Sequence, residues 1–284
     1  MNKIDDQVIE NLKFLCRTAD GITKFITATK LRLHAIDHPE NLDSVLNGYT
    51  RGETSYQGVT HIKGKLLRDI SRELEFFPVW TEWAKNVPGI GPVIAGNLIL
   101  LYYYKFTPIC QDCGGGLIKT PTENGDRQTF ICESCGKKAK GEGVLSHKIE
   151  LKDFAKISSW WHYLGMHVVD GKKPKRQKGV VSDWNSKGRL IGYQIGAQFN
   201  RCPTENTYKA FLEKERIKIR RKHPELTKGH NLNRAQSHTS KLFLSHWWKT
   251  CRTLDGLPVT EPYAKTILGH TGILEPFYQE PAVV

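Results

Sequence analysis

Four cysteines in two identical spacings constrain the fold of this 284-residue chain more than any other feature. Two residues separate the members of each pair, glycine follows each pair directly, and eighteen residues lie between the pairs: Cys110, Cys113, Cys132 and Cys135. One tight turn can present two such sulfurs to a metal ion, and four thiolates complete a tetrahedron that leaves no position for water. The spacing therefore predicts a structural zinc ribbon holding one Zn²⁺, with Gly125-Asp126 at its hairpin turn. Iron in the same cage is an alternative, whereas buried thiols or redox pairs do not explain the duplicated spacing.

The charge of the chain points to an acidic partner. Lys and Arg number 42 against 29 Asp and Glu, a formal charge of +13, which favours nucleic acid over a membrane surface. The longest apolar run, residues 98–104, is shorter than the ~20 residues that cross a bilayer, so we expect no membrane segment. The first residues lack the apolar stretch of a signal peptide, and seven cysteines do not suggest a disulfide framework. We therefore expect a cytoplasmic protein associated with nucleic acid.

Apolar residues at helical spacing predict a mainly α-helical protein. Residues 8–33 carry the seam of a long helix, and residues 60–77 carry a second apolar stripe. These two helices form a helical hairpin or coiled-coil region at 1–78, in which they pair with each other or join two chains in a homodimer. The Gly, Ser, Thr and Asn residues up to Gly58 predict a loop between them.

The remaining pattern predicts a larger helical domain at 79–255, with the zinc ribbon inserted at 107–140. Helices are expected in the second half of this domain at 151–166, 187–199, 205–222 and 231–253. A mostly irregular tail with four prolines follows at 256–284.

Residues 87–95, Val-Pro-Gly-Ile-Gly-Pro-Val-Ile-Ala, resemble a helix-hairpin-helix motif. The glycines permit a turn that other residues would strain, and Pro92 suits the first position of the second helix. The amides of Gly89, Ile90 and Gly91 would then lie at a helix N-terminus, where they can hold a phosphate oxygen without reading the base. The motif predicts backbone contacts with duplex DNA, and a plain turn between core helices is the alternative.

A basic loop at 170–179 is the second candidate contact. From residue 172 to residue 189, seven positive side chains stand against Asp183 alone, and Trp184 is available for base stacking. Such a loop predicts contact with nucleic-acid phosphates, the alternative being a solvated surface. The expected contacts are Lys172, Lys173, Lys175, Arg176, Lys178, Lys187 and Arg189. The run at 216–222 fits nucleic-acid contact and a helix with solvated charges equally well.

The order of these parts resembles the C-terminal half of the insertion-sequence transposases that are guided by a bridging RNA. The resemblance covers roughly residues 60 to 200. It is carried by a helical pair, the hairpin, a helix with Tyr163-Leu164-Gly165, a basic glycine-bearing loop and Ser186-Lys187-Gly188-Arg189. It implies a DNA-binding role in transposition or recombination, with a structured RNA as a second candidate partner.

The same resemblance leaves catalysis uncertain. Members of this family begin with an RNase-H-like domain that supplies four acidic residues, and this chain starts at the helices that would follow it. Their nucleophilic serine matches Asp170 here, before Gly171, so Ser182 and Ser186 are the candidate nucleophiles if the alignment is displaced. We expect a DNA-binding relative of these transposases, as a catalytically reduced remnant or a subunit. The alternatives are an RNA-binding zinc-ribbon protein and an active transposase with an unrecognised serine.

Overall fold

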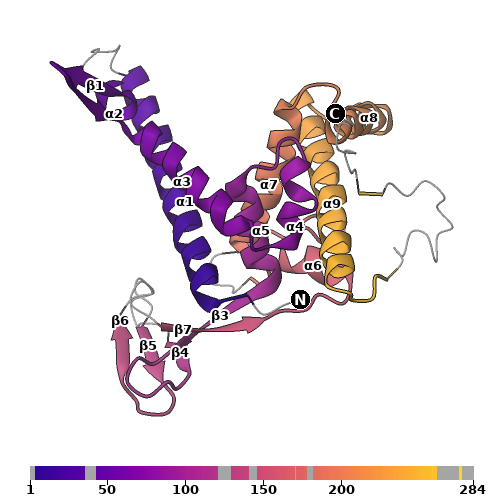
Figure 1. Ribbon diagram of the computed structural model, residues 1–284. Helices are drawn as coiled ribbons and strands as arrows, with labels where there is room; N and C mark the ends of the chain where they lie inside the picture. Colours follow the sequence, from indigo (N-terminus) through magenta and orange to yellow (C-terminus); the bar gives the residue numbers. More distant parts are fainter. Residues whose placement is uncertain are drawn as a thin grey trace. The chain divides into compact units, whose positions relative to one another are not determined.

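The structure, a computed structural model, describes residues 4–35, 43–120, 129–140, 146–169, 171–177, 182–260 and 275–276. The protein is mainly helical, as predicted, with several short strands (Figure 1). It divides into two compact units: Ile99–Asp153 forms the smaller, and Met1–Leu98 together with Phe154–Val284 forms the larger. No helix in these ranges is both long and apolar enough to cross a membrane.

A pair of helices begins the larger unit. Helix α1 (Asp6–Ala35) packs along α3 (Val59–Leu74), as Figure 1 shows. Of the predicted seam of α1, Leu12, Ala19, Ile26 and Leu33 are buried, and Val8, Leu15 and Ile22 are half-buried. Ile9 and Cys16, outside that seam, are buried as well. Of the two pairings that the seam allows, the structure contains the one within the chain.

The segment before Gly58, predicted as a loop, contains regular structure. Helix α2 (Asp43–Asn47) leads into an antiparallel hairpin of β1 (Gly48–Arg51) and β2 (Thr54–Gln57). Tyr49 and Tyr56 lie opposite each other and stack with 4.7 Å between ring centroids. Because the other strand residues are small or polar, the sequence resembles a loop, and the single aromatic pair that stabilises the hairpin was missed.

Helix α9 (Lys228–Leu254) is the longest of the remaining helices, and four others pack against it: α4 (Pro78–Thr81), α6 (Ile157–Tyr163), α7 (Ser186–Arg201) and α8 (Thr207–Lys222). The 3₁₀ helix η2 (Ala84–Asn86) follows α4, and α5 (Pro92–Tyr103) leads from the larger unit into the smaller one. Phe243 and Trp247 of α9 are fully buried, and Trp83 stacks on Phe243 with 5.5 Å between ring centroids. The predicted helix at 151–166 is wrong at its start, because a strand occupies residues 146–151 and α6 begins only at Ile157.

Three glycines let α7 approach its neighbours closely. Gly188, Gly192 and Gly196 follow one another at four-residue spacing and are buried in α7. A Cβ atom on Gly196 would lie 2.7 Å from the backbone oxygen of Gln236 in α9. Ser240 of α9 donates a hydrogen bond to the Gly192 carbonyl at 2.7 Å. Backbone and side chains of α9 thus lie directly against the glycine face of α7.

The smaller unit consists of two antiparallel sheets. Strands β3 (Tyr104–Ile109) and β7 (Ser146–Leu151) pair along their full length. Strands β4 (Leu117–Thr120), β5 (Thr129–Cys132) and β6 (Lys138–Lys140) form a three-stranded sheet in that order. The unit extends beyond the predicted insertion at 107–140 on both sides, because β3 begins before residue 107 and its partner β7 lies after residue 140.

Candidate metal centre and candidate nucleic-acid contacts

Two turns of the same form present the four cysteines. The Gly114 N–H donates to the Cys110 carbonyl at 2.9 Å, and the Gly136 N–H donates to the Cys132 carbonyl at 3.0 Å. Both glycines have positive φ angles, 71° and 69°, a conformation that residues with a Cβ atom rarely adopt. The glycine after each cysteine pair therefore closes the turn. The predicted hairpin residues Gly125 and Asp126 lie outside the described residues.

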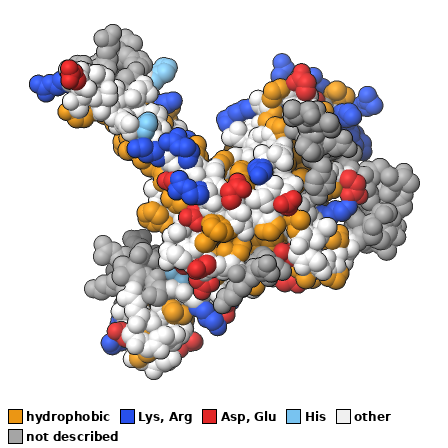
Figure 2. All heavy atoms as spheres, in the orientation of Figure 1, with side chains coloured by type: hydrophobic (Ala, Val, Ile, Leu, Met, Phe, Trp, Pro, Cys, Tyr) orange, Lys and Arg blue, Asp and Glu red, His pale blue; other side chains and the backbone are white. Residues whose placement is uncertain are grey.

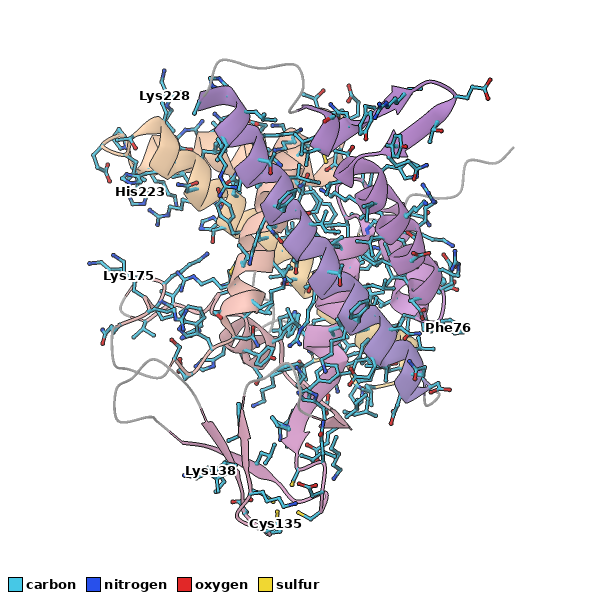
Figure 3. All side chains as sticks on the ribbon, turned by 90° about the vertical axis from the view of Figure 1, so that its left-hand side faces the viewer. Phe76, Cys135, Lys138, Lys175, His223 and Lys228 are labelled. Carbon is cyan, nitrogen blue, oxygen red and sulfur yellow. The ribbon has the colours of Figure 1, made fainter. Side chains whose placement is uncertain are left out.

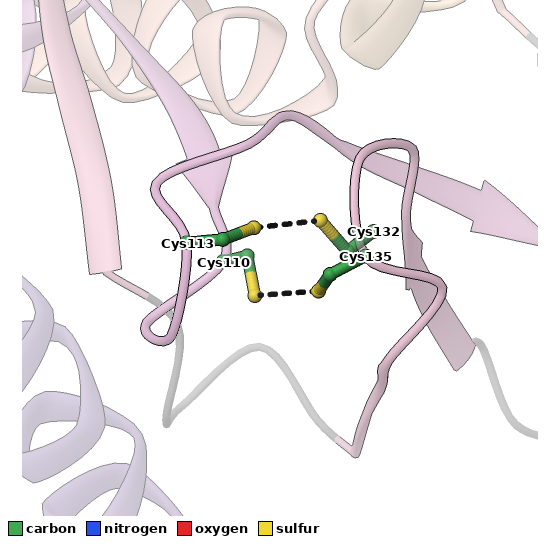
Figure 4. Close-up of side chains that lie close together, drawn as sticks. All are labelled: Cys110, Cys113, Cys132 and Cys135. Carbon is green, nitrogen blue, oxygen red and sulfur yellow. Dashed lines mark hydrogen bonds between the residues drawn. The ribbon is translucent and has the colours of Figure 1, made fainter.

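The four thiols lie together (Figure 4). A sulfur atom from each cysteine lies within 4.8 Å of the other three. The Sγ atoms of Cys113 and Cys132 are 3.4 Å apart, and those of Cys110 and Cys135 are 3.7 Å apart. Sulfur atoms around one zinc ion, each ~2.3 Å from it, are about 3.8 Å apart at the corners of a tetrahedron. The cluster has the dimensions of a single four-sulfur metal site.

Hydrogen bonds within the cluster shift the pKa values of two thiols in opposite directions. The Cys135 N–H donates to the Cys132 sulfur and, with the Cys113 thiol and the Ser134 N–H, lowers the pKa of Cys132 to about 6, although burial acts against the shift. For Cys113 the Gly115 N–H favours the thiolate, but hydrogen bonds with the Cys132 and Cys135 sulfurs outweigh it and raise the pKa to about 12. Metal ions bind the thiolate rather than the thiol. With four sulfurs around one centre, such a site has no open position, so the arrangement can stabilise the fold of the ribbon and offers no place for a substrate.

The predicted hairpin motif forms a tight turn, and its first helix is reduced to the three-residue η2. Helix α5 begins at Pro92, as predicted. The prediction of three available amides is wrong for Ile90, because its N–H donates to the Val87 carbonyl at 3.0 Å. Within the described part of the chain, Gly89 and Gly91 donate no backbone hydrogen bond. Among the described residues, these two amides therefore have no backbone acceptor.

Contacts with the junction of α7 and α8 hold this turn in place. The Pro88 carbonyl accepts a hydrogen bond from the Asn206 side chain at 3.2 Å. Gly89 has a φ angle of 96° and lies so close to its neighbours that a Cβ atom there would be 2.8 Å from the Cys202 sulfur. Glycine is required at this position both for the backbone conformation and for the close approach.

The basic loop is described at residues 171–177. Lys172, Lys175 and Arg176 are exposed, and Figure 3 shows Lys175 projecting away from the helices. Two backbone hydrogen bonds between Val169 and Lys172, of 2.8 and 3.0 Å, close the turn that precedes the loop. Lys178 and Asp170 lie outside the described residues.

The other predicted cations of this region have partners within the protein. Lys187, predicted to contact phosphate, forms an ion pair with Asp20 of α1. Arg189 donates to the Pro174 carbonyl and lies over the Trp184 ring, 4.9 Å from its centroid. Lys173 is half-buried, with its Nζ atom 3.7 Å from the Met166 sulfur. Arg189 and Lys173 therefore fasten the loop to the helices.

Two further basic features differ from the loop. In α8, Arg216 pairs with Glu213 at 2.9 Å, Ile219 is buried and Ile217 is exposed. The run at 216–222 therefore has one core residue and mostly solvated charges. In α9, Lys241 lies 4.2 Å from the centroid of the Trp161 ring. Sequence reasoning did not identify Lys241, which stands alone among apolar and small residues.

A group of two histidines and one aspartate was also missed. His162 lies 3.1 Å from an Asp183 oxygen, and the rings of His162 and His167 stack at 4.1 Å with 23° between their planes. Imidazole binds metal in the plane of its ring. Because two stacked rings direct their nitrogen lone pairs along nearly parallel planes, this geometry does not converge on one ion.

The candidate nucleophiles nearby are Ser182, which is partly exposed, and Ser186, which is exposed at the first position of α7.

Comparison of the chain with protein-family models, curated proteins and solved structures finds no match. What the protein does must therefore be inferred from its own residues.

Proposed function

We propose that the chain binds nucleic acid through backbone phosphates, with duplex DNA as the partner. The observation that carries this proposal is the anchored basic loop at 171–177. Lys172, Lys175 and Arg176 are exposed there, and none has a carboxylate within ion-pair distance among the described residues. The backbone of the same loop is held at Pro174 by Arg189. Cations on an anchored segment lose less conformational freedom when they meet phosphates, which favours binding.

The turn at Gly89 and Gly91 supplies a second phosphate contact. Its amides precede α5, where the helix dipole also favours an anion. The loop is fastened to Arg189 near the start of α7, and Gly89 packs against Phe199 near its end. Ten helical residues correspond to about 15 Å along the axis. The two contacts are therefore spaced along one helix, over a length that one nucleic-acid backbone can follow without reading the bases.

We further propose that the four cysteines hold one zinc ion. Closed four-thiolate sites with two-residue spacing are typical of structural zinc, and the sulfur–sulfur distances of 3.4 and 3.7 Å fit such a site. Iron prefers the same ligands and is distinguished by its absorption in visible light. The ion would stabilise the fold of the ribbon.

The order of the motifs supports a role in DNA transposition or recombination, as in the transposases that the sequence resembles. We expect binding without strand cleavage. Cleavage needs an activated serine against the scissile phosphate, together with groups that stabilise the developing charge. The position that matches the family's serine is Asp170 in this sequence. Incubation with magnesium and supercoiled plasmid tests this expectation. A covalent protein–DNA adduct that is lost on Ser182→Ala or Ser186→Ala would show an active transposase instead.

The binding proposal is tested by competition between duplex DNA, single-stranded DNA and RNA at fixed salt. Replacing Lys172, Lys175 and Arg176 together by glutamine should weaken binding to every duplex alike. It should also flatten the slope of log K against log salt by about 0.9 for each lost phosphate contact. Stronger binding of RNA than of duplex DNA would assign the same surface to RNA.

A matched control separates the loop from net charge. Figure 2 shows further Lys and Arg side chains along the pair of α1 and α3. Lys24, Lys65 and Arg68 are exposed on these two helices, and replacing them by glutamine removes the same charge. We expect the salt dependence of this control to stay close to that of the unchanged protein. Equal losses in both variants would contradict the assignment of the loop as the binding face.

A further inference from the structure

A small pocket lies behind the basic loop, within the larger unit. Its volume is about 160 Å³. Met166 and Lys173 form one wall, Arg189 and the glycine face of α7 form the second, and polar residues of α9 form the third. The lining residues of α7 and α9 are Gly192, Tyr193, Asn233, Gln236, Ser237 and Ser240. None of the residues that line the pocket is acidic.

Two cations, Lys173 and Arg189, line this pocket. A third, Lys241, lies over the Trp161 ring, and its charge acts on Lys173. Burial, followed by the charges of Arg189 and Lys241, lowers the pKa of Lys173 to about 8. Burial also lowers the pKa of Lys241 and of Arg189. In the ranges that the structure describes, no carboxylate forms an ion pair with any of the three.

The partners that these cations do have are weak or neutral. The Lys173 ammonium contacts the Met166 thioether, a weak acceptor. Arg189 contacts the Pro174 carbonyl and the Trp184 ring, and Lys241 lies over the Trp161 ring. Like charges brought together away from water are unfavourable unless a counter-charge joins them. Among the described residues, no carboxylate therefore balances these cations.

We propose that this pocket binds one phosphate group, held by Lys173 and Arg189, with the charge of Lys241 adding to the attraction. The side chains of Asn233, Gln236 and Ser237 complement a tetrahedral oxyanion, because amide and hydroxyl groups can donate to its oxygens. The Ser240 hydroxyl already donates to the Gly192 carbonyl. Phosphate also carries enough charge to balance more than one cation, and cation–phosphate hydrogen bonds are among the strong ones. The pocket is a different site from the exposed side chains of the loop, Lys172, Lys175 and Arg176.

A second cavity shows why cations alone are insufficient. A larger space of about 420 Å³ is lined by Arg216, Arg220 and Lys228, but Glu213 lines it as well. Glu213 pairs with Arg216 at 2.9 Å and with Lys209 at the same distance. A carboxylate there already pairs with neighbouring cations, whereas no carboxylate is among the described residues that line the smaller pocket.

The phosphate group can come from inorganic phosphate, or from the end of a nucleic-acid strand. Thermal unfolding of the whole chain with increasing inorganic phosphate, against chloride at matched ionic strength, tests the first source. Oligonucleotides of one sequence with a 5′-phosphate or a 5′-hydroxyl test the second. Phosphate should raise the unfolding midpoint with saturation, and a preference for the 5′-phosphate would identify a strand end as the source.

Lys173→Met is the decisive variant, and Lys24→Met on α1, outside the proposed phosphate contacts, is its control. Loss of the Lys173 contact should weaken phosphate binding about tenfold or more, as expected for one charge-assisted hydrogen bond. Lys24→Met should retain the phosphate effect. Because Lys173→Met also removes repulsion from the empty pocket, it should raise the midpoint in phosphate-free buffer, so a folding defect is not confused with lost binding.

A second variant, Lys241→Gln, should weaken phosphate binding less than Lys173→Met, because it removes a nearby charge and no lining residue. Broadening of the ³¹P resonance of phosphate provides an independent readout. The proposal is overturned if phosphate and chloride act alike on the unchanged protein, or if Lys173→Met responds to phosphate as strongly as the Lys24→Met control. Since this titration contains no nucleic acid, its failure is distinct from failure of the DNA-binding proposal.

Discussion

Removing the metal from the four-cysteine cluster should unfold the ribbon and leave the larger unit folded. Among the described ribbon residues, Phe130, Cys110 and Cys132 are buried, while Ile118 is 49% exposed. Burial of one large apolar side chain contributes about 1.5–3 kcal/mol. Ordering a residue costs ~1.5 kcal/mol, so Phe130 offsets the ordering of only about two residues.

Metal binding supplies the stability that the ribbon lacks. Small structural zinc sites contribute about 10–16 kcal/mol of apparent binding free energy, which is folding free energy when the site exists only in the folded state. The larger unit has its own core around Trp83, Phe243 and Trp247. Loss of zinc should therefore affect β4, β5 and β6 and spare α9.

Zinc content by plasma mass spectrometry and amide hydrogen exchange test this expectation. The purified chain should hold one zinc, and Cys132→Ser should lose it together with the protection of the β5 amides. Cys202→Ser, outside the cluster, should keep both. If β5 amides remain protected after chelation, or if Cys132→Ser binds as much zinc as the control, the metal does not stabilise the ribbon and the reasoning fails.

Two other predictions concern the larger unit. Gly196→Ala should destabilise it by about 1–3 kcal/mol, because the new Cβ atom would lie 2.7 Å from the Gln236 carbonyl oxygen. Gly21→Ala, with nothing within 4 Å of its Cβ position, should stabilise α1 by about 0.5–1 kcal/mol. Urea midpoints followed by tryptophan fluorescence compare the two, and a Gly196→Ala variant as stable as the original would refute the close contact. The pKa of Lys173 is lowered from 10.5 to about 8, so the unfolded chain binds its proton more tightly, and the free energy of unfolding should rise as the pH increases through this window. Lys173→Met should reduce that rise in phosphate-free buffer, and an identical pH profile in the variant would contradict the shift.

Features set by neighbouring residues were predicted from the sequence, and those set by distant residues were not. The helices expected at 187–199, 205–222 and 231–253 correspond to α7, α8 and α9, because helical periodicity is local. The cysteine spacing likewise predicted a cluster from residues within two short turns. By contrast, the strand at Tyr104–Ile109 was not predicted, because its partner strand at residues 146–151 lies far away in the sequence.

The candidate contacts follow the same division. Lys187 forms its ion pair with Asp20, 167 residues away in the sequence. No local sequence pattern predicts this pairing. Lys173 and Lys241 likewise approach each other from separate segments. The four-residue spacing of Gly188, Gly192 and Gly196 is a local signal that α7 packs closely against other elements, and sequence reasoning did not use it. Such a spacing indicates close packing, but not which charged side chains meet there.

Lys173 and Arg189 connect the basic loop with the pocket behind it, which couples the proposed functions of the two. Arg189 lines the pocket and also donates to the Pro174 carbonyl, while Lys173 immediately precedes Pro174 in the chain. A phosphate in the pocket would screen the repulsion between these two cations and so favour the position in which the loop is fastened to α7. Exposed Lys172 and Lys175 would then be presented with less freedom to reorient. By linkage, nucleic acid that holds the loop in this position must strengthen phosphate binding by the same factor, since both ligands favour one arrangement of one segment.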